Sequence, residues 1–307
     1  MNTQIHGAIV AALTPRLPYG VAIDSAAALD LVDFLESHGV DGITLFGSTG
    51  EFLHFDLEDR ARLVGLISKR SRVPILANAS HSTLDGALSL ARAAAGAGAA
   101  GVLIMPPYYF RYRPETLRAF FLEFAAQLTI PVYLYNIPQF TSDLPVSDAI
   151  DLLATGNFAG IKDSSGTWEN FDALQRAAVE RGFSVFVGSE RIYSRACAAG
   201  AAGMISGVAS VLPELIVAID RRARAGRSTT DLDRYVAEFL DQTLRFPFPA
   251  GIREALAVRG LKTGPHATPL GLTGERELEE FRGWFREWLP VIERTCSAVP
   301  EQEIHVP

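Results

Sequence analysis

Lys162 lies in the stretch GIKDSSGT, residues 160–167, at a place where a lysine is unexpected. The preceding residues Phe158–Ile161 are typical of the end of a short apolar strand, and Lys162 follows them directly. An amine enclosed by apolar groups favours its neutral form, and a neutral amine is a nucleophile that forms a Schiff base with a ketone. The iminium withdraws electrons, so a carbon–carbon or carbon–hydrogen bond beside the former carbonyl carbon breaks more easily. We therefore predict Schiff-base chemistry at Lys162, with an ordinary exposed loop lysine as the alternative.

Two further stretches offer the other groups that this chemistry needs. Tyr135 ends an apolar run and begins YNIP, where its phenol is placed to carry a proton. The stretch GSTGE, residues 47–51, offers two hydroxyls and backbone N–H groups freed by glycine, which suit a small carboxylate. It does not match the phosphate-binding loop, which requires a Gly-Lys pair. A core-packed Tyr135 and a plain turn at GSTGE are the alternatives.

A repeated glycine pattern indicates which elements position these residues. A glycine, two or three other residues, a second glycine and an apolar run occur four times, with the second glycine at Gly42, Gly101, Gly160 and Gly203. Such a repeat is typical of one structural unit used several times. Each copy predicts a helix that ends at a glycine with positive φ, then a tight turn and a buried parallel strand.

Four more apolar runs lie between or before these copies and complete a set of eight predicted strands. The eight runs begin at Ala8, Gly42, Val73, Gly101, Ile130, Gly160, Phe183 and Gly203. Amphipathic stretches between them predict helices, for example over residues 25–38, 57–70, 82–97, 114–128 and 145–155. This alternation predicts an α/β fold, a (β/α)8 TIM barrel in residues 1–224 that carries the active site. An open doubly wound sheet would need a glycine fingerprint after the first strand, and TPRLPYG after Leu13 has none.

The rest of the chain and its composition limit the classes of function. Beyond Arg224 the pattern is helical, so residues 225–307 are predicted to be a C-terminal helical region packed on the barrel. The net charge of −7 and the lack of a basic stripe argue against a nucleic-acid or anionic-membrane partner. Neither an apolar run of membrane-spanning length nor a signal peptide is apparent, and the two cysteines, Cys197 and Cys296, indicate a reducing cytoplasm. The six histidines are scattered, so we expect no metal site.

Four motifs in order, GSTGE, PPYY, YNIP and GIKDSS, resemble the dihydrodipicolinate synthase / N-acetylneuraminate lyase family. These are class I aldolases and synthases that handle pyruvate, and the resemblance covers nearly the whole chain. It implies that Lys162 forms the Schiff base with a 2-oxo acid, without another cofactor, and that Tyr135 is the general acid/base. It also implies that Thr49 hydrogen-bonds Tyr135 and links it to Tyr109, which in relatives reaches in from a neighbouring subunit.

The resemblance further implies a binding pocket and an assembly. Ser48 and Thr49 match the pair that binds the substrate carboxylate, and the backbones of Gly188 and Ile205 match positions that line the pyruvyl pocket. Relatives are commonly tetramers built as dimers of dimers, so a homotetramer that acts on a small 2-oxo acid is expected.

One position departs from the synthases of this family. They usually carry an arginine two places after the proline of the YNxP loop, where this chain has Phe140. Ser164 and other nearby hydroxyls offer hydrogen bonds to a substrate that bears hydroxyl groups. We therefore expect an aldolase that releases pyruvate and an aldehyde from a 2-keto-3-deoxy sugar acid or a 4-hydroxy-2-oxo acid. The synthase itself, a dehydratase using the same lysine, and a barrel that binds without catalysis are the alternatives.

Overall fold

The computed structural model describes residues 5–19 and 22–297, which form a closed barrel of parallel strands with three further helices packed against it. Strands follow one another around the barrel in chain order, and β8 closes it by pairing with β1. The strands are β1 Gly7–Ala11, β2 Gly42–Leu45, β3 Ile75–Asn78, β4 Gly101–Ile104, β5 Val132–Asn136, β6 Gly160–Asp163, β7 Ser184–Val187 and β8 Gly203–Ser206. Every residue of these strands is buried, as expected for a parallel sheet enclosed by helices.

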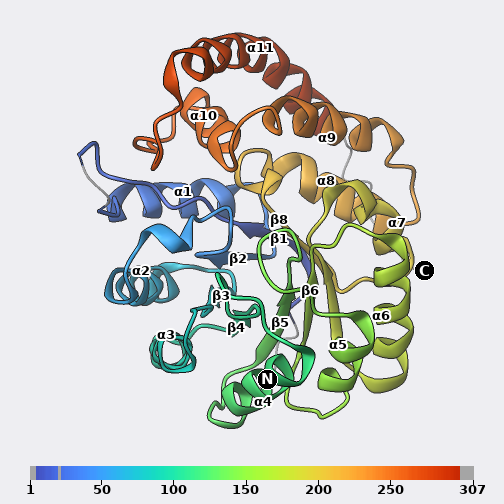
Figure 1. Cartoon of the computed structure of the whole chain (residues 1–307). Coiled ribbons are helices and arrows are strands. Elements are labelled where there is room, and N and C mark those ends of the chain that lie inside the picture. The colour runs from blue at the N-terminus through green and yellow to red at the C-terminus, as the bar shows by residue number, and fades with distance from the viewer. Residues whose placement is uncertain (1–4, 20–21, 298–307) are drawn as a thin grey trace.

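Helices surround the strands as a ring, which Figure 1 shows with the strands at its centre. They are α1 Ser25–Ser37, α2 Leu57–Arg70, α3 Leu84–Gly96, α4 Pro114–Ala126, α5 Val146–Leu153, α6 Trp168–Arg181, α7 Tyr193–Ala198 and α8 Pro213–Arg224. Short 3₁₀ turns follow three strands: η1 Phe52–His54, η2 Glu190–Ile192 and η3 Val208–Ser210. The predicted (β/α)8 TIM barrel is confirmed, and the five helices predicted by range begin and end within two residues of those observed.

Three helices complete the described part of the chain: α9 Thr230–Thr243, α10 Ala250–Val258 and α11 Gly271–Ser297. They lie together at the top of Figure 1, beside α8, and α9 also contacts η2 at the rim of the barrel. These helices occupy the predicted C-terminal helical region, although residues 298–307 lie outside the described residues. The division of the chain into two domains at residue 224 stays a prediction.

The glycine repeat has the structural basis that the sequence predicts. The first glycines of its copies, Gly39, Gly98, Gly156 and Gly200, all have positive φ, a conformation that costs glycine little. The second glycines allow strands to approach closely. A Cβ on Gly160 would lie 2.2 Å from the Ser184 carbonyl oxygen, so a larger residue would push β6 away from β7.

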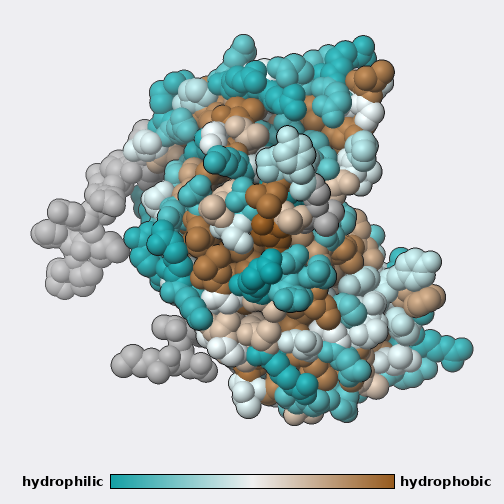
Figure 2. Space-filling model, turned by 90° about the vertical axis from the view of Figure 1, so that its left-hand side faces the viewer, coloured by the Kyte–Doolittle hydropathy of each residue, from teal (hydrophilic) through white to brown (hydrophobic). Residues whose placement is uncertain are grey.

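The face shown in Figure 2 has both hydrophilic and hydrophobic residues. Figure 2 views the molecule from the side that lies at the left in Figure 1, and shows hydrophobic side chains gathered in the middle of that face. None of the helices in residues 5–19 and 22–297 has the length and apolar character that a bilayer span requires. The cytoplasmic location stays a prediction.

Candidate active site

The candidate active site is a cavity of about 460 Å³ at the carboxyl ends of the barrel strands, where TIM-barrel enzymes carry their catalytic groups. Residues from the loops after β2, β5, β6, β7 and β8 line it, together with residues of α9 and of the segment that leads into α10. The cavity brings together all but one of the site residues predicted from the sequence: Ser48, Thr49, Tyr135, Phe140, Lys162, Ser164, Gly188 and Ile205. Tyr109 is the exception.

Lys162 lies in β6 at the inner wall of this cavity, and only 4% of its surface is exposed. The alternative of an exposed loop lysine is therefore wrong. Its Nζ lies 4.3 Å from the centroid of the Tyr135 ring. The two residues are register partners on the neighbouring strands β5 and β6, so the sheet itself sets their proximity. Among the described residues, no protein hydrogen bond or ion pair is recorded for the Lys162 amine. It therefore faces the cavity without an internal partner.

Tyr135 is buried, and its hydroxyl lies 3.3 Å from the Ser48 hydroxyl. The resemblance assigned this contact to Thr49, whereas the structure gives it to the preceding residue. Thr49 also lines the cavity, and its hydroxyl lies on the side of Gly207, where an added Cβ would come within 2.9 Å of it. The Ser48 hydroxyl therefore lies beside Tyr135, and the Thr49 hydroxyl lies beside Gly207 in the same cavity.

The loop that carries Ser48 and Thr49 is held at both ends. Phe46 and Glu51 have positive φ, which is uncommon outside glycine and indicates a strained backbone held by its surroundings. Asn78 donates to the Phe46 carbonyl oxygen at 2.7 Å, and Thr14 donates to the Gly50 carbonyl oxygen at 2.8 Å. Glu51 accepts a hydrogen bond from Arg253 of α10, so the C-terminal helices also help to position this loop.

Gly188 is required beside Lys162 because no side chain fits there. A Cβ on Gly188 would lie 3.0 Å from Cε of Lys162 and 1.9 Å from Oγ of Ser164. Ser164 follows β6 and donates its backbone N–H to the Asn136 carbonyl oxygen at 2.9 Å. This arrangement leaves a narrow space around Nζ of Lys162, in which the amine can reach the carbonyl carbon of a small 2-oxo acid.

A buried polar pair ties β5 to β6 next to the lysine. Asn136 donates to the Asp163 carboxylate at 2.8 Å, and the Ser165 hydroxyl donates to the other carboxylate oxygen at 2.5 Å. Burial raises the pKa of the Asp163 carboxyl above its ordinary value, although these two hydrogen bonds act in the opposite direction. Asn136 and Asp163 are register partners directly after Tyr135 and Lys162, so their contact stabilises the alignment of the two catalytic candidates.

The outer part of the cavity is apolar on one side. Phe140 lines it and is more than half exposed, and its ring centroid lies 6.5 Å from that of Phe248, which comes from the segment before α10. Arg111, an arginine near enough to replace the one that synthases carry, donates instead to the backbone oxygen of Thr141. Its guanidinium therefore supports the YNIP loop.

The cavity is also lined by two charged residues, Glu190 and Arg191, to which sequence reasoning assigned no role. Glu190 accepts hydrogen bonds from the Ser206 hydroxyl at 2.7 Å and from the Val208 backbone N–H at 3.3 Å. Arg191 lines the same cavity and pairs with Asp241 of α9 at 2.6 Å. Their position directly after the predicted strand β7 could have indicated that they line the site. Nothing in the sequence indicated the same for Phe248.

Tyr109 lies outside this cavity, in the loop between β4 and α4. Its side chain is 90% exposed, its φ is +81°, and its ring packs edge-on against the exposed Phe110 at 4.9 Å. Within this chain it makes no recorded contact with Tyr135 or Ser48 among the described residues. Its predicted place in a proton relay therefore depends on a second chain.

Across residues 5–19 and 22–297, no three side chains of His, Cys, Asp or Glu gather closely enough to hold a metal ion. The groups that line the cavity are an amine, a phenol, several hydroxyls, the carboxylate of Glu190 and the guanidinium of Arg191.

Comparison with known proteins identifies the family to which this chain belongs. A family model described as the Dihydrodipicolinate synthetase family matches residues 4–286. The chain belongs to this family. It is similar to the 4-hydroxy-tetrahydrodipicolinate synthase of Methanosarcina barkeri, with 27% identity over 94% of this chain and 100% of that protein. The corresponding protein of Methanoculleus marisnigri is 32% identical over 84% of this chain and 92% of its own length.

Solved structures of the family share the fold. The chloride-inhibited dihydrodipicolinate synthase from Acinetobacter baumannii, complexed with pyruvate, has a TM-score of 0.85 and 28% identity, covering 94% of this chain and 99% of that one. The 2-keto 3-deoxygluconate aldolase from Picrophilus torridus has a TM-score of 0.80 and 24% identity, covering 85% of this chain and 96% of that one, and shows the fold alone. Members of the dihydrodipicolinate synthetase family are pyruvate-dependent class I aldolases, and this chain is a carbon–carbon lyase of that family.

Proposed function

We propose that this enzyme cleaves a 2-keto-3-deoxy sugar acid, or a related 4-hydroxy-2-oxo acid, into pyruvate and an aldehyde through a Schiff base at Lys162. The observation that carries this proposal is an enclosed lysine amine with no hydrogen bond or ion pair to the described residues, 4.3 Å from the ring of a buried tyrosine in the strand-end cavity. A nucleophilic lysine needs apolar enclosure and access to the substrate, and this position supplies both.

The reaction follows from the groups around Lys162. Its amine adds to the C2 carbonyl of the substrate, and Tyr135 gives its phenol proton to the hydroxyl that leaves as water, so that an iminium and a phenolate form. The Tyr135 phenolate removes the proton of the C4 hydroxyl, the C3–C4 bond breaks, and its electron pair moves into the iminium to form an enamine. The aldehyde leaves, C3 of the enamine takes a proton back from Tyr135, and water releases pyruvate. No metal is needed, because the iminium accepts the electrons.

Ser48 and Thr49 hold the substrate carboxylate in this proposal. Their loop lies beside Tyr135 and offers two hydroxyls and backbone N–H groups, which together suit a small anion. The contact between Ser48 and Tyr135 would also orient the phenol toward C4, which is the role that the resemblance gave to Thr49.

The outer cavity favours an aldehyde portion with hydroxyl groups and no negative charge. Glu190 and Arg191 line it, with Arg191 paired to Asp241, and Phe140 and Phe248 add an apolar surface. A distal carboxylate would meet the carboxylate of Glu190 and a guanidinium, that of Arg191, which is already paired with Asp241. Hydroxyl groups can instead donate to Glu190 and accept from Ser164 or Ser189, which also line the cavity.

The second candidate is 4-hydroxy-tetrahydrodipicolinate synthase, which condenses pyruvate with aspartate semialdehyde. The names of the curated relatives in Methanosarcina barkeri and Methanoculleus marisnigri favour it. Both candidates use the same Schiff base, so they differ only in what the outer cavity accepts.

One assay distinguishes the candidates. The purified enzyme is supplied with a panel of 2-keto-3-deoxy acids, and the release of pyruvate and of the matching aldehyde is followed by mass spectrometry. A parallel reaction contains pyruvate and aspartate semialdehyde. Aldol cleavage as the faster reaction supports the proposal, synthase turnover as the faster reaction overturns it, and loss of water without cleavage identifies a dehydratase.

We also propose that the enzyme assembles as a homotetramer, a dimer of dimers in which Tyr109 enters the active site of a neighbouring chain. Tyr109 and Phe110 are strongly exposed on the loop after β4, and Leu53 is exposed on η1 after β2. Large apolar side chains on an enzyme's rim are typical of a surface that another chain covers.

A further inference from the structure

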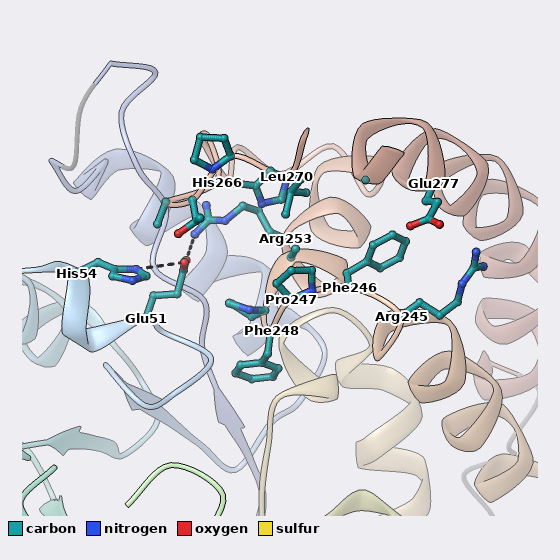
Figure 3. Close-up of a pocket in the computed structure, with 16 residues that line it drawn as sticks. Glu51, His54, Arg245, Phe246, Pro247, Phe248, Arg253, His266, Leu270 and Glu277 are labelled. Atoms are coloured by element: carbon teal, nitrogen blue, oxygen red, sulfur yellow. Dashed lines mark hydrogen bonds and ion pairs between the residues drawn. The ribbon is translucent and has the colours of Figure 1, made fainter. Parts of the chain in front are cut away.

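A second cavity, of about 350 Å³, lies between the barrel rim and the C-terminal helices, and we call it the C-terminal cavity. Its lining comes from three parts of the chain. The barrel contributes Glu51 and His54, and α10 with the segment before it contributes Arg245–Ala250 and Arg253. The segment before α11 and the first turns of that helix contribute His266–Leu270, Gly274 and Glu277. Figure 3 shows His54 and Glu51 on one side, with Arg253 pointing to Glu51 and with Arg245 and Glu277 at the far end.

We propose that the C-terminal cavity binds a small carboxylate anion with an apolar body, and that its occupant acts on the active site through Phe248. The proposal goes beyond the aldolase activity, since none of the groups assigned to the reaction binds this ligand.

Two buried guanidiniums share one carboxylate at the edge of this cavity, where Arg253 and Glu51 line the wall and Arg16 lies behind Glu51. Arg16 and Arg253 both face the single carboxylate of Glu51, and all three side chains are buried. Nε and Nη1 of Arg16 have no hydrogen-bond partner among the described residues, and its guanidinium lies over the Phe55 ring at 4.5 Å. Burial lowers the pKa of the Arg16 guanidinium, Glu51 acts in the opposite direction, and the neighbouring positive charge of Arg253 lowers it further. A bound anion would offset this positive charge.

Further groups on the wall of the cavity favour a negatively charged ligand. Arg245 lines it with an exposed side chain, and among the described residues its one polar contact is a hydrogen bond of 3.1 Å to Gln242. Helices α10 and α11 both begin at the cavity wall, near Ala250 and Gly271, and the first turn of a helix carries partial positive charge. Glu277 is the one carboxylate that faces the cavity besides Glu51.

The rest of the wall is apolar and selects the body of the ligand. Phe246, Phe248, Leu270 and Ala267 line it together with three prolines. A cavity of this size with a few polar groups set in an apolar wall is typical of sites for small organic molecules. An inorganic ion alone would leave most of this surface uncovered, so a carboxylate with an apolar portion fits better.

The C-terminal cavity shares a wall with the active site. Phe248 lines both cavities and lies next to Phe140 in the active site. Glu51, which lines the C-terminal cavity, belongs to the same loop as Ser48 and Thr49. A ligand that fills the C-terminal cavity holds Phe248 on its active-site side, which narrows the outer part of the active site. We therefore expect the occupant to weaken binding of the 2-oxo acid that the enzyme cleaves.

Benzoate is the probe for this site, and benzylamine, of similar shape and opposite charge, is its matched control. Calorimetric titration of the full-length protein is carried out with excess pyruvate, so that a competing 2-oxo acid is present for the active site. We expect saturable binding of benzoate with a Kd in the millimolar range or tighter and none for benzylamine. Equal binding of both probes, or no saturable binding of benzoate, overturns the proposal.

Variants locate the binding. Ala267→Phe fills the cavity without changing its charge and should weaken benzoate binding about tenfold or more. Arg245→Gln removes one charge and should weaken it about threefold. Arg286→Gln, on α11 but outside the cavity, is the control and should bind as the unchanged protein does. Benzoate binding that survives both Ala267→Phe and Arg245→Gln places the ligand elsewhere. A thermal melt checks that Ala267→Phe is folded, and if it is not, Arg245→Gln decides alone.

Kinetics test the link to the active site. Benzoate should raise KM for the cleaved 2-oxo acid more than it lowers kcat, and Ala267→Phe should abolish this effect. Benzoate that binds at the C-terminal cavity but leaves both constants unchanged overturns the coupling through Phe248.

Discussion

Nζ of Lys162 lies 4.3 Å from the centroid of the Tyr135 ring, and the two residues are partners in the register of β5 and β6. The distance is a property of the barrel, because neighbouring parallel strands hold such partners side by side along their whole length. The next pair in the register, Asn136 and Asp163, is hydrogen-bonded at 2.8 Å. The lysine and the tyrosine are therefore held by the sheet, and the polar pair beyond them prevents the strand ends from separating.

Lys162 should be the lysine that borohydride traps with pyruvate. Reduction of the iminium should add a stable mass to the chain, and peptide mapping is simple because the chain has three lysines, Lys69, Lys162 and Lys262. Lys162→Ala should lose both the label and turnover, whereas Lys69→Ala, on the outer helix α2, should keep them. A label on Lys69 or Lys262, or none at all, contradicts the Schiff-base mechanism.

Tyr135→Phe should lower kcat by about 10²–10⁴-fold, because it removes the proton carrier while keeping the ring beside Lys162. Tyr133→Phe is a matched control on the same strand, since Tyr133 is buried and lies outside the cavity. Borohydride trapping of pyruvate on Tyr135→Phe should still occur, because attack by the amine does not require cleavage. Equal losses in the two variants would show that the effect comes from packing.

Ser48→Ala tests which hydroxyl orients Tyr135. It removes the contact of 3.3 Å and should cost about tenfold in kcat, the effect of one ordinary hydrogen bond. Ser48→Thr keeps a hydroxyl and should restore most of the rate. If Thr49→Ser impairs kcat more than Ser48→Ala does, the assignment of this contact to Ser48 is wrong.

Most of the fold and the centre of the site could be predicted from the sequence, because both follow from strand patterns. Apolar runs and the glycine repeat marked the strands, and parallel strands bring residues at their carboxyl ends together, which placed Tyr135 beside Lys162. The choice between Ser48 and Thr49 was not predictable, because adjacent hydroxyls in a loop with positive φ at both ends follow no strand alternation. Phe248 was also missed, since a residue far along the chain reaches the site only through the packing of α9 and α10.

Asp163 should make stability depend on pH in a defined direction. Burial raises the pKa of its carboxyl in the folded state, so the folded protein holds this proton more tightly than the unfolded chain. The contribution of Asp163 to stability is complete at a pH below the pKa that its carboxyl has in the unfolded chain. It is lost as the pH rises through the pKa that the carboxyl has in the folded protein. The unchanged protein should therefore lose stability relative to Asp163→Asn as the pH rises above about 4, the ordinary pKa of aspartate.

Urea unfolding of both proteins at several pH values measures this difference. Other carboxylates titrate in both proteins alike, so only the difference between the two curves reports on Asp163. If the unchanged protein instead gains stability relative to Asp163→Asn as the pH rises, the prediction is wrong. The hydrogen bonds from Asn136 and Ser165 would then affect the pKa of Asp163 more strongly than burial does.

Tyr109 tests the proposed assembly. If it enters a neighbouring active site, Tyr109→Phe should lower kcat less than Tyr135→Phe, because Tyr109 acts through other groups. Tyr109→Ala should also weaken the assembly, which sedimentation velocity measures directly. Dilution to monomers should reduce specific activity, and a verified monomer with full activity contradicts the proposal that Tyr109 acts across a subunit interface.

Phe140 should decide between a hydroxyaldehyde and a charged aldehyde in the outer cavity. Its ring, next to Phe248, offers an apolar surface, and the nearby Arg111 is committed to the Thr141 backbone. A carboxylate entering here would lose its hydration without a free cationic partner, which is costly in an enclosed site. We therefore expect aspartate semialdehyde to be a poor second substrate compared with neutral hydroxyaldehydes. Phe140→Arg adds a guanidinium able to form two charged hydrogen bonds with a carboxylate, and should raise kcat/KM for aspartate semialdehyde relative to a hydroxyaldehyde by about tenfold or more.

The control for this substitution is Phe140→Leu, which keeps the surface apolar and should leave the ratio of the two kcat/KM values unchanged. Arg191 is the residue that could defeat the argument, because it lines the same cavity and its pairing with Asp241 is half exposed and therefore weak. Arg191→Gln separates the cases. If the unchanged enzyme uses aspartate semialdehyde as well as any hydroxyaldehyde and Arg191→Gln abolishes that use, then Arg191 binds the distal carboxylate and the enzyme is a synthase. If Arg191→Gln leaves a strong preference for hydroxyaldehydes intact, the apolar wall of Phe140 and Phe248 is what excludes the charged substrate.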